Sequence, residues 1–201
     1  SGVGLVTLAV PQRLRPALAG QFPEATYPAV TDTDVLGVST ANLLLASLEN
    51  YQAMLVGPGL GDAGSFLAAL LDGLRAPETG RCPPLVVDAD GLNLLAAMPE
   101  WSGKLPPNSI LTPHPGEMAR LVGRSLNAIR DEDRVELARE QATEWGHIVV
   151  LKGAYTMIAA PDGRATLLPF ANPVLAVGGS GDVLAGIIVG LMAQEIGRAH
   201  V

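Results

Sequence analysis

Residues 172–194 read NPVLAVGGSGDVLAGIIVGLMAQ, and the fold and function of the chain are best approached from this stretch. A glycine turn is followed by Asp182, which begins an apolar helix expected over 183–193. Glycines in series let several backbone N–H groups point the same way and form a concave site for an anion. The free N–H groups and positive dipole end of the helix strengthen this site, so we expect phosphate there. The turn consists of Gly178, Gly179, Ser180 and Gly181.

Asp182 needs a separate explanation, because a carboxylate in an anion-binding turn repels phosphate. It can act as a base that takes a proton from a hydroxyl group while the glycine N–H groups hold the phosphoryl group under attack. Alternatively, Asp182 only caps the helix. The residues alone leave both interpretations open.

The helix expected over 183–193 is apolar on all sides and carries Gly186 and Gly190 one turn apart. This pattern predicts a buried helix that neighbouring elements approach closely. Its apolar run is far shorter than the ~20 residues that span a membrane, so we do not expect a membrane span.

Composition limits the classes of function. With 201 residues, the chain suits one domain, which we place at 1–194. A hydrophobic content of 48% with 23 glycines and few aromatic residues favours an α/β protein, and a net charge of −7 argues against nucleic acid or an anionic membrane as partner. The single cysteine, Cys82, excludes an internal disulfide and fits a reducing compartment, the cytoplasm.

Apolar runs alternate with helical patterns along the chain, which predicts a mainly parallel sheet with right-handed crossovers. A hairpin is expected where two strands, 155–160 and 164–168, flank a Pro-Asp-Gly turn. The other strands are expected at 4–10, 26–30, 53–56, 85–87, 109–111 and 147–151, and helices at 12–19, 40–48, 65–74, 91–97 and 131–145, the last with its charges facing solvent.

The glycine stretch GPGLG at 57–61 follows a predicted strand. Gly59, Gly61 and Gly64 satisfy the dinucleotide-binding spacing, and Asp88 ends the next strand, as a Rossmann fold requires. Pro58 inside the turn and the position of the unit in mid-chain argue against that fold. A tight turn that serves only packing is a further alternative.

Polar residues follow three other predicted strands. Asp88 and Asp90 could hold Mg²⁺ through water, or could brace the loop and cap the next helix. His114, between two prolines, could donate to a ligand or be purely structural. Lys152 could meet phosphate and Gly153 could let the backbone approach a nucleotide, unless both only form a hairpin turn.

Five sequence motifs resemble those of a known family. They are GPGLG, DADGLNLL, TPHPGE, LKGAYT and GGSGD, in this order between residues 57 and 194. They resemble the NAD(P)H-hydrate dehydratase family of the ribokinase-like superfamily. The resemblance implies a three-layer αβα sandwich with a mainly parallel central sheet. It also implies an ADP- or ATP-dependent dehydration that returns the S-epimer of hydrated NADH or NADPH to NADH or NADPH, with Mg²⁺ on the nucleotide phosphates.

The resemblance also implies residue roles and partners. Asp182 would take the proton from the ring hydroxyl, and Gly59, Gly61 and His114 would shape the pocket for the hydrated ring. The sequences of the TPHPGE and GGSGD motifs resemble those of bacterial members, which favours ADP as the donor. A homo-oligomer and functional pairing with an NAD(P)H-hydrate epimerase are expected. The adenine nucleotide would contact Lys152, Gly153, Ala154, Tyr155, Thr156, Gly178, Gly179, Ser180 and Gly181.

Two other interpretations remain open. A ribokinase-like kinase for thiazole or pyrimidine alcohols would use the same turn and aspartate but stop at the phosphorylated alcohol. The chain could also be an inactive fragment, because the resemblance leads us to expect that a glycine-rich strand–turn–helix unit before residue 1 and helices after Gln194 are absent from it. Residues 195–201 break the apolar pattern, and we expect them to be a non-native tail.

Overall fold

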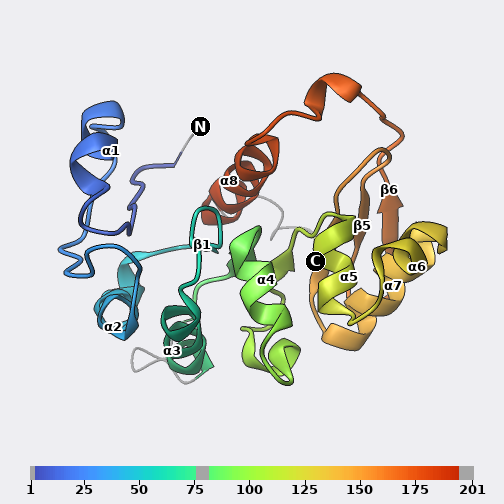
Figure 1. Cartoon of the computed structure of the whole chain (residues 1–201), viewed down its shortest axis with the longest axis horizontal. Helices are drawn as coiled ribbons and strands as arrows, with labels where there is room; N and C mark the ends of the chain where they lie inside the picture. The colour runs from blue at the N-terminus through green and yellow to red at the C-terminus, as the bar shows by residue number, and fades with distance from the viewer. Residues whose placement is uncertain (1–2, 76–81, 195–201) are drawn as a thin grey trace.

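The structure is a computed structural model that describes residues 3–75 and 82–194. Its central sheet has six strands in the order β1-β2-β3-β4-β5-β6 (Figure 1). The first four strands are parallel, and β5 and β6 continue the sheet as antiparallel neighbours. The mainly parallel sheet and the hairpin predicted from sequence are therefore confirmed. The strands are β1 (Met54–Val56), β2 (Leu85–Val87), β3 (Ile110–Leu111), β4 (Ile148–Leu151), β5 (Met157–Ala159) and β6 (Ala165–Leu167).

Helices lie on both sides of the strands. In Figure 1, α8 lies above the strands, on the side away from α3 and α4, and it contacts β1 and β2. On the other side, α2 packs against α3, α4 against α5, and α7 against β4, β5 and β6. The helices are α1 (Arg15–Gln21), α2 (Val38–Leu45), α3 (Gly64–Arg75), α4 (Asp90–Ala96), α5 (Pro115–Leu121), α6 (Leu126–Asp131), α7 (Arg134–Trp145) and α8 (Ser180–Ala193), with 3₁₀ turns at Leu48–Asn50, Trp101–Lys104 and Pro173–Leu175.

The core forms two clusters that are joined by Trp145. The first fills the space between β1, β2 and helices α2 to α4, and the second lies between α5, α7 and strands β4 and β5. Trp145 packs against both clusters and meets Trp101 edge-on at a ring-centre distance of 4.7 Å. All three residues of β2 are fully buried, as expected for a strand inside a parallel sheet.

The N-terminal part differs from the prediction. The strands expected at 4–10 and 26–30 reduce to one parallel bridge between Thr7 and Thr26. Thr26 donates to the carbonyl of Val6, and Leu8 donates to the carbonyl of Thr26. The next donor in this ladder would come from Pro28, which has no N–H group, so the pairing stops. The helix expected at 12–19 begins later, at Arg15, with Pro16 in its first turn.

Helix α8 also differs from the prediction. We expected a buried helix, but Ala185 is its only residue that is fully buried. Val183, Ile187 and Leu191 are 63%, 55% and 43% exposed. The prediction is wrong because, within the described residues, only β1 and β2 make extensive contact with α8. The tail expected at 195–201 lies outside the described residues. In the described part of the chain, none of the helices has the length and apolar character to cross a bilayer.

Candidate active site

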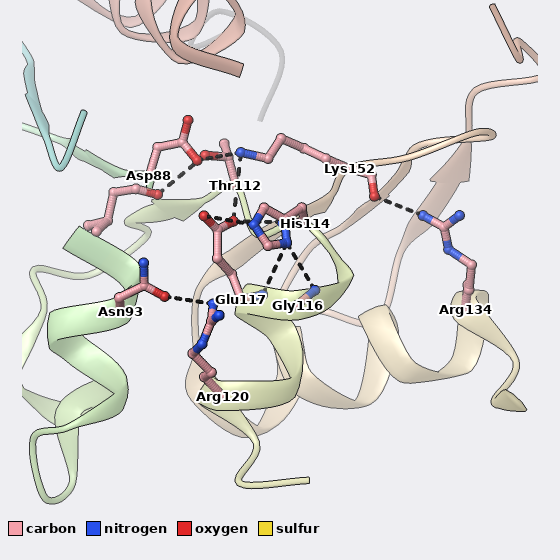
Figure 2. A network of polar contacts seen from close by, with 10 residues as sticks. Asp88, Asn93, Thr112, His114, Gly116, Glu117, Arg120, Arg134 and Lys152 are labelled. Carbon is pink, nitrogen blue, oxygen red and sulfur yellow. Dashed lines mark hydrogen bonds and ion pairs between the residues drawn. The ribbon is translucent and has the colours of Figure 1, made fainter. Parts of the chain in front are cut away.

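Three ionisable side chains meet at the carboxyl ends of the parallel strands (Figure 2). Lys152 follows β4 and Asp88 follows β2. Nζ of Lys152 donates to Oδ1 of Asp88 at a distance of 2.5 Å. Oε2 of Glu117, in the first turn of α5, lies 3.8 Å from the same Nζ. We call Asp88, Glu117 and Lys152 the ionic cluster. Their side chains are 1%, 5% and 18% exposed, so each charge depends on its partners for stability.

The second oxygen of Asp88, Oδ2, is buried and has no hydrogen-bond partner in the described part of the chain. Burial raises the pKa of the Glu117 carboxyl above its usual range. The N–H group of His114 and the charge of Lys152 oppose part of this rise. Two carboxyl groups thus share one ammonium group, and a further positive charge would be favourable beside them.

His114 is the N-cap of α5, which is the structural role considered from sequence. Its Nδ1 accepts from the N–H groups of Gly116 at 2.9 Å and Glu117 at 3.2 Å, and Glu117 Oε2 accepts from the N–H of His114 at 2.8 Å. This reciprocal pair is a capping box. Because Nδ1 accepts, a neutral ring carries its proton on Nε2. Nε2 lies 3.4 Å from Oε1 of Glu117, and the side chain is 51% exposed, so a ligand that accepts from Nε2–H would share it with this carboxylate while the cap stays intact.

The glycine turn lies directly against the ionic cluster. A Cβ atom on Gly181 would lie 3.3 Å from Nζ of Lys152 and 3.7 Å from Oδ2 of Asp88. Gly179, with φ of 83°, is the N-cap of α8 and makes no side-chain cap. The N–H groups of Gly181 and Asp182 meet no acceptor among the described residues. The first turn of α8 therefore presents free donors beside the ionic cluster.

Asp182 is the third residue of α8 and is exposed. Its carboxylate makes no hydrogen bond within the described part of the chain. The alternative in which Asp182 caps the helix is therefore wrong. The carboxylate is available at the same helix end as the free N–H groups.

The GPGLG loop and the DADGLNLL motif pack against each other. A Cβ atom on Gly57, whose φ is 131°, would lie 1.7 Å from the carbonyl oxygen of Asp88, so only glycine fits. Asp90 does not cap α4, because the N-cap is Ala89 and makes no side-chain cap. Instead, Oδ2 of Asp90 accepts from the N–H of Gly61 at 2.8 Å. This bond ties the loop that carries Gly59 and Gly61 to the start of α4.

The turn at 152–156 is part of the hairpin and also borders the ionic cluster. The N–H of Lys152 donates to the carbonyl of Pro113 at 2.8 Å, and the N–H of Tyr155 donates to that of Phe170 at 3.0 Å. Both backbone bonds anchor the turn between neighbouring segments. The two interpretations of this turn are compatible, because the hairpin leaves Gly153, Ala154 and Tyr155 exposed.

Two arginines of this region carry contacts that the sequence did not predict. Arg120 on α5 donates to Oδ1 of Asn93 on α4 at 2.9 Å (Figure 2). This bond joins the helix that begins within the TPHPGE motif to the helix of the DADGLNLL motif. Arg134 on α7 was expected to face solvent, but its guanidinium donates to backbone carbonyls of the turn at 152–156. No spacing rule marks such a residue, because its partners are backbone atoms.

Comparison with known proteins identifies the family. A family model described as NAD(P)H-hydrate dehydratase matches residues 1–200. The chain belongs to the NAD(P)H-hydrate dehydratase family. Among curated members, it is 41% identical over 199 residues to the bifunctional NAD(P)H-hydrate repair enzyme Nnr of Moorella thermoacetica, and 39% identical to that of Thermofilum pendens. These matches cover 98% of the chain but only 36% and 37% of the relatives, so the chain spans about a third of their length.

Solved structures agree with this membership of the NAD(P)H-hydrate dehydratase family. The ADP/ATP-dependent NAD(P)H-hydrate dehydratase from Bacillus subtilis, co-crystallized with ATP/Mg²⁺ and soaked with CoA, matches with a TM-score of 0.73 and 34% identity. A ribokinase-like superfamily protein from Enterococcus faecalis matches with a TM-score of 0.71 and 27% identity. They cover 96% of the chain, which spans 65% and 62% of the two structures. The predicted ribokinase-like fold is thus confirmed.

Proposed function

We propose that the chain dehydrates the S-epimer of hydrated NADH or NADPH, with ADP or ATP as the phosphoryl donor. The observation that carries this proposal is the convergence of all five family motifs in one place. Lys152, Asp88 and Glu117 form the ionic cluster, and Gly181 lies against it. Gly61 is joined to the same region through Asp90. Family membership and the names of the relatives support the substrate class.

In the proposed mechanism, Asp182 takes the proton of the ring hydroxyl while the hydroxyl oxygen attacks the terminal phosphorus of the nucleotide. The bond from this phosphorus to the bridging oxygen breaks, and the nucleotide leaves one phosphate shorter. The free N–H groups of Gly181 and Asp182 and the ammonium of Lys152 stabilise the phosphoryl oxygens. The C–O bond of the resulting phosphate ester then breaks, assisted by the ring nitrogen lone pair. Loss of a proton from the neighbouring ring carbon forms the double bond of the dihydronicotinamide.

The predicted ring-binding residues, Gly59, Gly61 and His114, would hold the hydrated ring from a loop and from the start of α5. The loop with Gly59 and Gly61 is open to solvent, because a Cβ atom at either position meets nothing within 4 Å. His114 would donate from Nε2, which now lies 3.4 Å from Oε1 of Glu117, and would keep its cap through Nδ1. We place the ring between this loop and His114, and the nucleotide over residues 152–156 and 178–181. Pairing with an epimerase is supported by the word bifunctional in the names of the curated relatives.

Mg²⁺ fits this site as a partner of the nucleotide. The described residues contain no cluster of three histidine, cysteine or acidic groups that would hold a metal by themselves. The unpaired Oδ2 of Asp88 and the carboxyl of Glu117 would supply one or two oxygens, directly or through water, as Mg²⁺ sites commonly require. When bound, the ion neutralises charge on the phosphates.

The test is the recovery of NADH absorbance from hydrated NADH in the presence of Mg²⁺ and either ADP or ATP. We expect recovery that depends on one of the nucleotides. Asp182→Asn should lower the rate by about 10²–10⁴-fold and spare nucleotide binding, because it removes only the base. Asp72→Asn, at an exposed position on α3, is the matched control and should have normal activity. Normal turnover by Asp182→Asn would exclude the proposed role, and release of a phosphorylated alcohol as final product would favour a kinase.

A further inference from the structure

Arg134 has an unusual set of partners for an arginine at the start of a helix. Its Nη1 donates to the carbonyl of Ala154 at 2.8 Å, and its Nη2 donates to the carbonyls of Lys152 at 3.1 Å and Leu151 at 3.3 Å. Figure 2 shows the guanidinium pointing from α7 toward Lys152. No carboxylate of the described residues pairs with it. Its positive charge is therefore shared only with neutral carbonyl groups.

Contact with Lys152 O fixes the direction of the next N–H group. In a trans peptide, the C=O and N–H bonds point in opposite directions, and the described chain has no cis peptide. Because the carbonyl of Lys152 points to Arg134, the N–H of Gly153 points away from Arg134. The carbonyl of Gly153 accepts from Oγ1 of Thr156 at 3.0 Å, which turns the N–H of Ala154 away from that hydroxyl.

Gly153 and Ala154 are exposed residues, and their N–H groups meet no acceptor within the described part of the chain. Two neighbouring free donors on a turn suit an anionic or strongly polar ligand. The guanidinium adds positive charge to the turn, and the carbonyl groups of Lys152 and Ala154 point toward it. The turn is thus preorganised as a donor surface before a ligand binds.

The backbone of this turn also needs support. Tyr155 has φ of 57°, which is sparsely populated for a residue with a side chain, and Gly153 has φ of 145°, which glycine alone adopts readily. A Cβ atom on Gly153 would lie 2.9 Å from Nη2 of Arg134, so the guanidinium packs directly against this residue. Strained backbone persists where its surroundings over-determine it. Here Arg134 provides three of the contacts that do so.

We propose that Arg134 is a positioning residue that shapes the turn at 152–156 to bind the adenine nucleotide. This inference rests on the proposed function, because the nucleotide is the ligand assigned to the turn. Arg134 does not touch the reacting atoms in this scheme; it acts through the backbone of Lys152, Gly153 and Ala154. Its loss should weaken nucleotide binding and leave the affinity for the hydrated ring unchanged.

The experiment compares Arg134→Lys with Arg139→Lys on the whole chain. Lysine keeps the charge but lacks the planar fork that reaches three carbonyls. Arg139 is the matched control, since it lies on the same helix and pairs with Glu136 at the surface. Three quantities are measured: the Kd for ADP by calorimetry, the Michaelis constants for ADP and hydrated NADH, and amide hydrogen exchange of Lys152 and Tyr155 without ligand.

For Arg134→Lys, we expect the Kd and Michaelis constant for ADP to rise about tenfold, as for loss of one charge-assisted contact, with no change in the Michaelis constant for hydrated NADH. The two amides should exchange faster, and Arg139→Lys should behave as the parent chain. Normal ADP binding or unchanged amide exchange in Arg134→Lys overturns the role of Arg134 and leaves the proposed function standing. Absence of ADP binding by the parent chain overturns the proposed nucleotide site and this inference with it.

Discussion

Removal of Lys152 is the most direct test of the ionic cluster. In Lys152→Met, a side chain of similar length replaces the ammonium group that now contacts Asp88 at 2.5 Å and Glu117 at 3.8 Å. Asp88 is 1% exposed, Lys152 binds its Oδ1, and its Oδ2 has no hydrogen-bond partner in the described part of the chain. The variant therefore leaves a buried carboxylate without its counter-charge.

Breaking a buried ion pair from one side costs about 3–5 kcal/mol. Because the side chain of Lys152 is 18% exposed, water screens part of the interaction, and we expect about 3 kcal/mol, the lower end of that range. For a domain of this size, such a loss lowers the melting temperature by about 6–12 °C. A second substitution, Asp88→Asn, should restore more than half of the loss, because it removes the stranded charge.

Urea unfolding followed by tryptophan fluorescence measures this loss, since Trp101 and Trp145 contact each other between the two core clusters. Lys104→Met serves as the control, because Lys104 has no ion pair among the described residues. A loss below about 1 kcal/mol, the range of a surface ion pair, would refute the view that these charges depend on one another. Failure of Asp88→Asn to restore stability would refute it as well.

Two further predictions concern the scaffold of the site. Gly57→Ala should destabilise the chain by about 3 kcal/mol or more, because its Cβ would lie 1.7 Å from the Asp88 carbonyl at a φ of 131°. Gly103→Ala, which meets nothing within 4 Å, should change the urea midpoint little, and equal effects of the two would refute the packing reason. Burial lowers the pKa of His147, whose Nε2 contacts the Ser102 carbonyl at 2.9 Å. The fold thus favours the neutral ring, so its contribution is present above the ordinary histidine pKa of about 6.5 and is lost as pH falls toward the lowered value. His147→Gln should show a smaller fall of the urea midpoint between about pH 7 and pH 5, and an identical fall would contradict this assignment.

Local sequence patterns predicted much of the sheet and the position of its glycine turns. Strand β2 and the hairpin of β5 and β6 follow from apolar runs bounded by turn residues, and they occur at or within the predicted positions. The strands predicted at 4–10 and 26–30 were not confirmed, because Pro28 limits their pairing, and its effect beside Leu8 depends on a register that the sequence does not reveal. Burial of α8 also could not be predicted from its apolar character, because burial depends on which elements pack against it.

Motifs located the residues of the candidate site better than they described their contacts. Asp88 and Lys152 were each noted after a predicted strand and Glu117 only as part of the TPHPGE motif, but the ion pair of Asp88 with Lys152 joins positions 64 residues apart. Asp90 was expected to cap α4, yet its carboxylate reaches the loop of Gly61. The roles of Asp182 and of the ring-binding residues stay predictions, because they depend on ligands.

The order of the strands has a consequence for how the site assembles during folding. The segment from α7 to β6 is joined by short connections, and Arg134 contacts Lys152 at a separation of 18 residues. Contacts between nearby residues lose less chain entropy on closure than distant ones. The pairing of Lys152 with Asp88 spans 64 residues and needs the parallel strands between them in register. We therefore expect the turn at 152–156 to form early, with its local neighbours, and the ionic cluster to be completed only when the slower parallel part of the sheet has formed.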